Sequence, residues 1–515
     1  MVLVTELPPE IIHNVFRFVD PPDLAWIPRV CKSFHYAIRG NPMLFKDVYT
    51  AHFDNPPRDD VDWEQVLKDV VRLQVVCRRP GVEDKRDELS FVYETVNQFL
   101  KNASSQGERA SNSATHALSR NAALLTELFS DPRNQNAFLE RSFIYERARG
   151  ELPPHASFSS PPKVEHQQSA KLHCLYGVPL LHLHRSSHDT RQGKMSPFAC
   201  SKVYDLRQYT AKTRWGPFMD DGSDRTDWEK VEAIMLVLGA NLSRLGLNVF
   251  PICKNFWDVP FAGVWPNSYM PLPVLEREKD ENELEDPYGV TGTWLRVVCF
   301  LDYTDFFNFN FNPENELPSN IPRRAIHYGE ATRLILMKIS VTKVEPPGPE
   351  DGQALPVVHF KGISRSLDDS WDENANSDLR GTVEIKGTVR LTREGEVRWT
   401  TFSVFNGQER WRSESVQIGG VKSAKGVVGH WFDKDYDPRG PAGPTAFWKT
   451  SDKVTHGSHE HQAFLDEYQE IELADADYDP EQDEGVEDDV DDDVEIELFL
   501  GPEVDLAHIL HSHEL

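Results

Sequence analysis

The first 50 residues carry apolar side chains at the spacing of α-helices. After the proline-led start Leu7-Pro8-Pro9, one broad apolar face is formed by Ile11, Ile12, Val15, Phe16 and Val19. Asp20-Pro21 ends this helix and caps the next one. The apolar pattern continues through Leu24, Ile27, Val30, Cys31 and Phe34, and Leu44-Phe45 closes it. Pro28 interrupts the second helical run, so we expect a break there. The spacing predicts a compact helical unit over residues 1–50.

Helical spacing continues through the next hundred residues. It is clear over residues 63–77, 88–101 and 122–149, with breaks at Pro80-Gly81 and Asp131-Pro132. We therefore expect a helical linker region over residues 51–150. Residues 151–200 are rich in Pro, Ser and His without a regular period, which favours an irregular linker. One strong helix is predicted over residues 227–245.

Beyond residue 245 the period changes from that of helices to that of strands. Val383, Ile385, Gly387, Val389 and Leu391 alternate with polar residues, which predicts a strand with one buried face. Similar patterns occur at 294–301, 335–342, 357–363, 397–405, 409–418 and 426–432, which makes about seven strands. Short strands joined by turns, without crossover helices, favour an antiparallel β-barrel or sandwich. The predicted fold class is thus α+β, with a β-rich domain over residues 201–455.

The charge of the chain is concentrated at its end. The formal net charge is −28, yet residues 460–515 hold 22 Asp and Glu and no Lys or Arg. About six negative charges remain on the rest of the chain, so we expect a disordered acidic tail over residues 456–515. The near-neutral body offers no basic surface for nucleic acid.

Other features of the sequence bear on location. The six cysteines are widely spaced and form no CxxC pair, which is typical of reduced thiols. We find neither a signal peptide nor an apolar run of membrane-spanning length, so we expect no membrane association and a location in the cytoplasm and/or nucleus.

The N-terminal motif carries the clearest functional signal. It runs through Leu7-Pro8-x-Glu10-Ile11-Ile12, Phe18 to Leu24, Val30-Cys31-Lys32-Ser33-Phe34 and Pro42-x-Leu44-Phe45. In order and spacing it closely resembles an F-box. The resemblance implies a three-helix unit over residues 1–50 that docks on the adaptor Skp1, and through it on a cullin and a RING subunit.

The resemblance also implies which side chains bind the adaptor. They are divided between an internal core and an exposed apolar strip, and the sequence leaves this division open. The candidates are Leu7, Pro8, Ile11, Ile12, Val15, Phe16, Leu24, Trp26, Val30, Cys31, Phe34, Leu44 and Phe45. The alternative is a helical hairpin sealed inside a larger core.

Two further resemblances concern the second half of the chain. Stretches 228–241 and 429–448 resemble fungal F-box proteins. More distantly, the β-rich half resembles the barrel of the animal F-box protein that recruits cyclin D1, because a strand over 426–431 is followed by a Gly-Pro turn at 440–444. This likeness implies a barrel whose mouth accepts a peptide segment of a target protein, including its C-terminus.

Aromatic and charged residues gather near the end of the β-rich domain. Trp beside Arg is typical of protein-binding hot spots, and polar loops between strands often carry function. The candidate target-binding residues are Trp399, Trp411, Arg412, Trp431, Asp433, Asp435, Tyr436 and Trp448, with a loop over residues 433–444. Alternatively, these tryptophans fill the core of the barrel.

No sequence signature of catalysis is present. We find no GxSxG elbow, P-loop or dinucleotide-binding glycine motif, and no metal-ligand spacing, so we expect no catalytic residues, metal or cofactor. The leading hypothesis is a non-catalytic, substrate-recognition subunit of a Skp1–cullin–F-box ubiquitin ligase, with an unidentified protein substrate. The alternatives are a β-barrel ligand-binding module in a Skp1 complex outside the ligase, and an acid-tailed chaperone of basic proteins.

Overall fold

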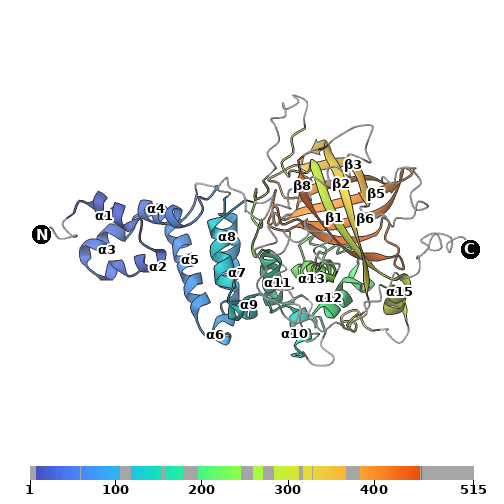
Figure 1. Ribbon diagram of the computed structural model, residues 1–515, viewed down its shortest axis with the longest axis horizontal. Coiled ribbons are helices and arrows are strands. Elements are labelled where there is room, and N and C mark those ends of the chain that lie inside the picture. The colour runs from blue at the N-terminus through green and yellow to red at the C-terminus, as the bar shows by residue number, and fades with distance from the viewer. Residues whose placement is uncertain are drawn as a thin grey trace, which may run out of the picture.

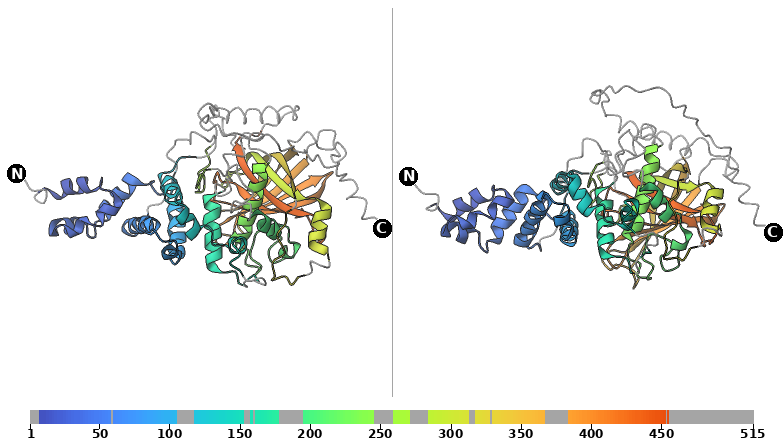
Figure 2. Two further views of the ribbon diagram at one scale, coloured as in Figure 1. Left: turned by 60° about the horizontal axis from the view of Figure 1, so that its bottom comes forward. Right: turned by 90° about the horizontal axis from the view of Figure 1, so that it is seen from below.

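Helices and a β-barrel lie end to end in this chain (Figure 1). The computed structural model describes residues 7–57, 60–104, 117–152, 157–158, 161–177, 195–244, 259–270, 284–312, 317–327, 329–366, 383–452 and 454. The helices of the first 150 residues extend to one side of the barrel, and two further views show the same elongated arrangement (Figure 2). The acidic tail expected over residues 456–515 lies outside the described residues.

Short helices build the N-terminal unit, as the spacing predicted. They are α1 (Pro9–Phe16), α2 (Pro21–Leu24), the 3₁₀ turn η2 (Ile27–Arg29), α3 (Lys32–Ile38) and α4 (Pro42–His52). Pro28 lies within η2, so the expected break separates α2 from α3. Asn41 caps α4, because its side chain accepts a hydrogen bond of 3.1 Å from the Leu44 N–H.

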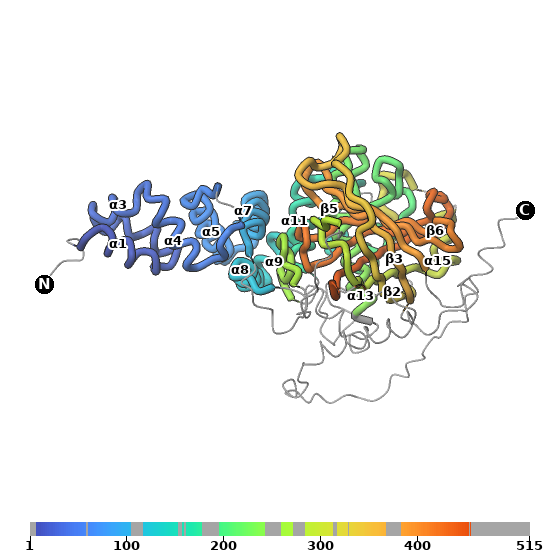
Figure 3. The backbone as a smooth tube through the Cα atoms, turned by 90° about the horizontal axis from the view of Figure 1, so that it is seen from above, coloured from blue at the N-terminus to red at the C-terminus, as the bar shows by residue number. Residues whose placement is uncertain are grey.

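A second group of helices continues directly from the first (Figure 3). It comprises α5 (Trp63–Arg78), α6 (Glu83–Arg86), α7 (Leu89–Lys101), α8 (Arg120–Phe129), α9 (Pro132–Phe138) and α10 (Phe143–Ala148). Aromatic rings connect the two groups: Tyr49 of α4 contacts Trp63 at 5.6 Å, and Phe53 contacts Phe99 at 5.3 Å between ring centroids. The core is therefore continuous from the N-terminal unit into the helices that follow.

The structure corrects the prediction of an irregular linker over residues 151–200. That range contains α11 (Val164–Tyr176) and most of α12 (Ser196–Val203), both packed on α13 (Trp228–Arg244). The apolar period of α11 is weak because polar side chains also face the core. His173 Nδ1 lies 2.7 Å from Glu232 of α13, and Gln167 donates to Asp227 at 2.8 Å. Because polar residues that pair in this way also occupy the buried face, the sequence shows no regular hydrophobic period over α11.

The helix α13 joins the two halves of the molecule. It begins and ends within one residue of the prediction, and it packs against β1, β7 and β8 as well as α11 and α12. Ile234, Leu236 and Leu238 are fully buried in this layer. Apolar side chains all around a helix indicate that it is covered on every side.

Eight strands form one closed antiparallel barrel in chain order. They are β1 (Gly292–Leu301), β2 (Glu330–Glu345), β3 (Val357–Ser366), β4 (Val383–Leu391), β5 (Val397–Phe405), β6 (Gln408–Gln417), β7 (Val427–Asp433) and β8 (Ala442–Ser451). The prediction missed β8, because Gly443 and Pro444 indicated a loop there. The strand tolerates both residues, and its pairing with β1 closes the barrel. A helix, α15 (Tyr303–Phe311), lies between β1 and β2.

One face of every strand points into the barrel, because side chains alternate along a strand. Trp294 of β1 and Trp399 of β5 lie on strands that are not neighbours in the sheet, yet their ring centroids are 5.0 Å apart. Phe447 and Phe360 contact Trp399 at 5.4 and 5.7 Å. One end of the interior is thus a packed apolar core, which also contains Met337, Ile339, Ile385 and Val389.

Within the described part of the chain, no helix is long and apolar enough to span a bilayer.

The packing around Trp399 gives a direct test of the barrel core. Because this side chain is fully buried, Trp399→Ala is expected to lower the free energy of unfolding by about 3–5 kcal/mol. Denaturant titration followed by circular dichroism measures the loss. Trp26→Ala is the matched control, since Trp26 is 62% exposed and its removal leaves no cavity. Equal stability of the two variants would contradict the interior position of Trp399.

Candidate functional site

Large apolar side chains are exposed in the N-terminal helical unit. Of the described residues, fifteen large hydrophobic side chains are exposed, and seven of them fall within residues 11–43. These seven form what we call the N-terminal apolar surface: Ile11, Val15, Phe18, Trp26, Val30, Tyr36 and Met43. Such a concentration of exposed apolar residues is typical of an interaction site.

Local geometry holds several of these side chains in place. Ile11 and Val15 are four residues apart on α1, so they share one helical face. The Arg17 guanidinium lies 4.4 Å from the Phe18 ring, and that of Arg29 lies 4.4 Å from the Trp26 ring. Flat cations stacked on exposed rings restrict the rings' motion without covering both faces.

The predicted adaptor-binding residues divide into two groups in the structure. Ile12, Phe16, Leu24, Leu44 and Phe45 are buried in the core of the unit, at most 7% exposed. These five side chains stabilise the fold and are not available for contact with a partner.

The other eight keep accessible surface. Pro8, Ile11, Val15, Trp26 and Val30 are exposed, and Leu7, Cys31 and Phe34 are partly buried. Three other exposed residues of the N-terminal apolar surface, Phe18, Tyr36 and Met43, were not among the predicted candidates. Phe18 lies beyond the end of α1, and Tyr36 and Met43 lie on the outer sides of their helices, so no apolar period marks them.

A second candidate site lies at one end of the barrel. Here the interior-facing residues are only partly buried, and we call them the barrel mouth: Val298, Phe300, Arg333, Ser403, Trp411, Trp431 and Asp433. Trp411 and Trp431 meet edge to face, with ring centroids 5.4 Å apart. The Trp431 indole N–H donates to the Cys299 carbonyl at 3.0 Å, and this hydrogen bond holds the ring over Gly443. A side chain at position 443 would collide with the Trp431 ring.

The predicted target-binding residues do not form one surface. Trp411, Trp431 and Asp433 belong to the barrel mouth, whereas Trp399 is fully buried deeper in the same interior. Trp448 is 4% exposed on the outer face of β8, in the core shared with the helices. Asp435 is exposed in the turn after β7, and this turn is shorter than predicted because β8 begins at Ala442.

Arg412 and Tyr436 lie on the outside of the barrel, where they hold a loop. Tyr436 stacks on Trp215 at 5.5 Å, and its hydroxyl donates to the Leu206 carbonyl at 3.2 Å. The Arg412 guanidinium lies 5.5 Å from the Trp215 ring. These contacts fasten residues 206–226 to strands β6 and β7.

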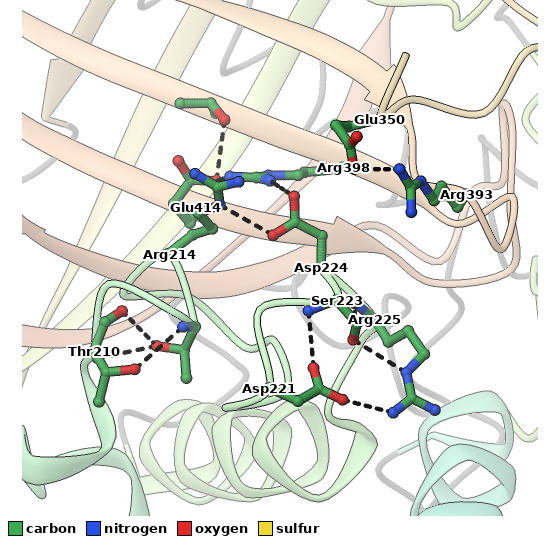
Figure 4. Close-up of polar contacts among 12 residues, drawn as sticks. Thr210, Arg214, Asp221, Ser223, Asp224, Arg225, Glu350, Arg393, Arg398 and Glu414 are labelled. Atoms are coloured by element: carbon green, nitrogen blue, oxygen red, sulfur yellow. Dashed lines mark hydrogen bonds and ion pairs between the residues drawn. The ribbon is translucent and has the colours of Figure 1, made fainter. Parts of the chain in front are cut away.

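Buried ion pairs strengthen the same attachment (Figure 4). Arg398 of β5 donates to Glu414 of β6 at 2.8 and 2.9 Å, and both side chains are at most 3% exposed. Asp224 of the loop lies 3.2 Å from Arg398 and 3.0 Å from Arg214. Because both carboxylates and the central guanidinium are paired, we assign this network a structural role.

Within the loop of residues 206–226, hydrogen bonds from Ser223 and Arg225 lower the pKa of Asp221 to about 2.

The described residues hold no group of three His, Cys, Asp or Glu side chains arranged as metal ligands.

The structural role of the Glu414 network is testable. Of the described carboxylates that pair with the buried Arg398 guanidinium, Glu414→Ala leaves that of Asp224 alone, so we expect the substitution to lower the free energy of unfolding by about 3–5 kcal/mol. Thermal and denaturant unfolding measure the change. The control Glu350→Ala removes the exposed ion pair with Arg393 and should alter stability by under about 1 kcal/mol. A Glu414→Ala protein as stable as this control would refute the role.

Comparison with protein-family models matches residues 4–46 to the F-box domain. This match confirms the motif identified between Leu7 and Phe45. No curated protein and no solved structure matches the chain. The chain therefore carries an F-box domain, a domain that binds Skp1-type adaptors, generally as a non-catalytic part of cullin-based ubiquitin ligases.

Proposed function

We propose that this F-box protein is the substrate-recognition subunit of a Skp1–cullin–F-box ubiquitin ligase. It binds Skp1 through the N-terminal apolar surface and a target protein through the β-barrel. The observation that carries the proposal is the F-box match at residues 4–46, which coincides with the main concentration of exposed apolar side chains among the described residues.

The exposed side chains supply enough apolar area for a stable complex. Full burial of one aliphatic or aromatic side chain contributes roughly 1.5–3 kcal/mol. Association costs at least about 4 kcal/mol in lost freedom, so four or five of these residues, buried together, overcome that cost. Trp26, 62% exposed and the largest of the seven, is the leading candidate for the central contact.

The shape of the molecule suits a recognition subunit. Helices α5 to α10 separate the F-box from the barrel, so an adaptor at one end leaves the barrel free for a target (Figures 1 and 3). The continuous core between the two groups of helices favours a fixed distance rather than a loose tether. Holding a target at a fixed place near the ligase raises its effective concentration at the ubiquitin-loaded enzyme. The chain then needs no chemistry of its own.

The barrel mouth is the proposed target-binding site. Trp411 and Trp431 present partly exposed aromatic surface there. Asp433 pairs with Trp411 across β6 and β7, and the Arg333 guanidinium lies 5.4 Å from the Phe300 ring. Aromatic and charged groups combined in a partly buried site are typical of protein-binding hot spots. Since Skp1–cullin ligases act on intracellular proteins, this function places the chain in the cytoplasm and/or nucleus.

A second candidate function is a ligand-binding barrel in a Skp1 complex outside the ligase. The closed eight-stranded barrel favours it, because barrels of this size can hold one small ligand. Trp294, Trp399 and Phe447 pack together at one end of that interior, which leaves little room for a ligand there. A Skp1 complex that never contains a cullin would favour this second candidate.

Adaptor binding tests the first half of the proposal. Val15→Asp combined with Trp26→Ala should weaken the affinity for Skp1 at least about 30-fold, because it removes a central aromatic contact and places a charge in an apolar interface. Calorimetric titration of the purified full chain with Skp1 measures this.

The matched control is Val75→Asp, an equally exposed apolar residue on α5 outside the F-box. It should bind Skp1 as the unmodified chain does. Undiminished Skp1 binding by the Val15→Asp, Trp26→Ala variant, or by a chain without residues 1–50, would show that the adaptor does not use this surface.

Target selection tests the second half. Trp411→Ala with Trp431→Ala should keep Skp1 binding and lose the bound target proteins. Quantitative proteomics under proteasome inhibition compares the proteins bound to this variant with those bound to the Val15→Asp, Trp26→Ala variant. The latter should still bind the target proteins but should not shorten their lifetimes. The same bound proteins and lifetimes in both variants would exclude the mouth as the recognition site.

A further inference from the structure

An arginine lies inside the barrel without an acidic partner among the described residues. Arg296 is two residues after Trp294 on β1, so its side chain points to the same interior face, and it is 6% exposed. Its Nε donates to the Thr445 hydroxyl at 2.9 Å, and Thr445 also faces the interior from β8. Burial lowers the pKa of Arg296 to about 10, so the side chain remains charged at neutral pH.

Among the described residues, this guanidinium differs from the other two that are buried, Arg398 and Arg323. Arg398 donates to Glu414 at 2.8 Å, and Arg323 lies 3.2 Å from Asp205. No carboxylate of the described residues pairs with Arg296, although a guanidinium has five N–H donors. An uncompensated buried charge is costly. A bound anion removes that cost.

A buried hydroxyl that pairs with no described residue lies in the same row of the barrel as Thr445. The Ser415 hydroxyl is buried and has no hydrogen-bond partner among the residues that the structure describes. Ser415 pairs with Gly429, and Gly429 pairs with Thr445, so these three residues form one row across β6, β7 and β8. A side chain at Gly429 would lie 2.2 Å from the Ser415 oxygen, so the hydroxyl occupies the space that the glycine leaves. The hydroxyl is therefore on the interior side, in the row of Arg296's own partner, Thr445.

The position of Arg296 relates it to the barrel mouth. Val298 of the mouth is two residues further along β1, a rise of roughly 7 Å. On the other side of Arg296, the Trp294–Trp399 contact fills the interior. The interior of an eight-stranded barrel is only wide enough for side chains or one small ligand. A width of this kind suits a single side chain or the end of a peptide segment and excludes a folded surface.

We propose that Arg296 and Ser415 bind an oxyanion, a carboxylate or a phosphate, carried by a peptide segment that enters through the barrel mouth. The guanidinium donates two parallel hydrogen bonds to the oxyanion and the Ser415 hydroxyl a third, while Trp411 and Trp431 contact an apolar side chain of the same segment. The proposal rests on the target-binding role of the barrel and names the chemistry of that target.

Synthetic peptide libraries test the proposal on the full chain bound to Skp1. Four libraries of random eight-residue peptides, each rich in aromatic and aliphatic residues, differ only in charge. One has a free C-terminal carboxylate and no other acid, one has Asp or Glu and an amidated end, one has phosphoserine and an amidated end, and one is neutral and amidated. Mass spectrometry of the retained peptides measures enrichment.

At least one anionic library should be enriched over the neutral library, and the enriched one identifies the source of the oxyanion. For peptides selected from it, Arg296→Met should weaken binding at least about 30-fold and Ser415→Ala by a smaller factor. Arg393→Met, a surface arginine of the 392–396 turn, should leave binding unchanged. Equal enrichment of the neutral library, or unchanged binding by Arg296→Met, would overturn the proposal.

Stability provides an independent readout. Because Arg296→Met leaves no described carboxylate buried without its partner, the variant should unfold at the same or a higher denaturant concentration than the unmodified chain. A markedly lower midpoint would show that the guanidinium already has a partner, and would contradict the proposed site.

The outcome is also separable from the ligase function. Anionic peptides could bind through Arg296 even if the Val15→Asp, Trp26→Ala variant still binds Skp1. That result would support the oxyanion site and contradict the proposed adaptor-binding surface.

Discussion

Closure of the sheet between β1 and β8 is the constraint on which the rest of the second half depends. The pairing of Arg296 with Phe447 sets which side chains face inward on both strands. A shift of one residue would exchange the two faces, placing Trp294 outside and Leu295 inside. The outward face of β1 is in turn the surface on which α13 packs, so the same register also positions the helical half.

Buried arginines on the two faces of the barrel differ in whether a described carboxylate pairs with them. On the outer face, Arg398 and Glu414 are paired and shared with Asp224, and they hold the 206–226 loop against the sheet. On the inner face, Arg296 is also buried, and among the described residues its side chain donates to the Thr445 hydroxyl alone. Fully paired groups stabilise a fold, whereas an unpaired buried charge is tolerated where binding compensates it. This contrast separates a structural network from a site.

The two candidate sites lie at opposite parts of an elongated molecule. The F-box presents apolar side chains on short helices, which suits a partner that buries them permanently. The barrel mouth combines partly buried aromatic rings with polar groups, which suits the selection of one segment among many. The helices between them, tied by the Tyr49, Trp63, Phe53 and Phe99 contacts, keep the two binding events apart while fixing their distance.

The sequence by itself determined the F-box, the long helices and most of the strands, because Leu7 to Phe45 and the alternation around Ile385 are local patterns that neighbouring residues fully encode. Only the tertiary structure decided that α11 is a buried helix, since its His173 and Gln167 are matched by residues about sixty positions away. The same holds for β8, which contains Gly443 and Pro444 and is defined by its pairing with β1. The tertiary structure also decided that Phe16 is buried while Phe18 is exposed. In the barrel, it decided that Trp411 and Trp431 meet at the barrel mouth, whereas Arg412 lies on the outer face. The burial of a side chain and its contacts depend on segments that are far apart in the chain, and the local pattern of apolar residues does not encode them.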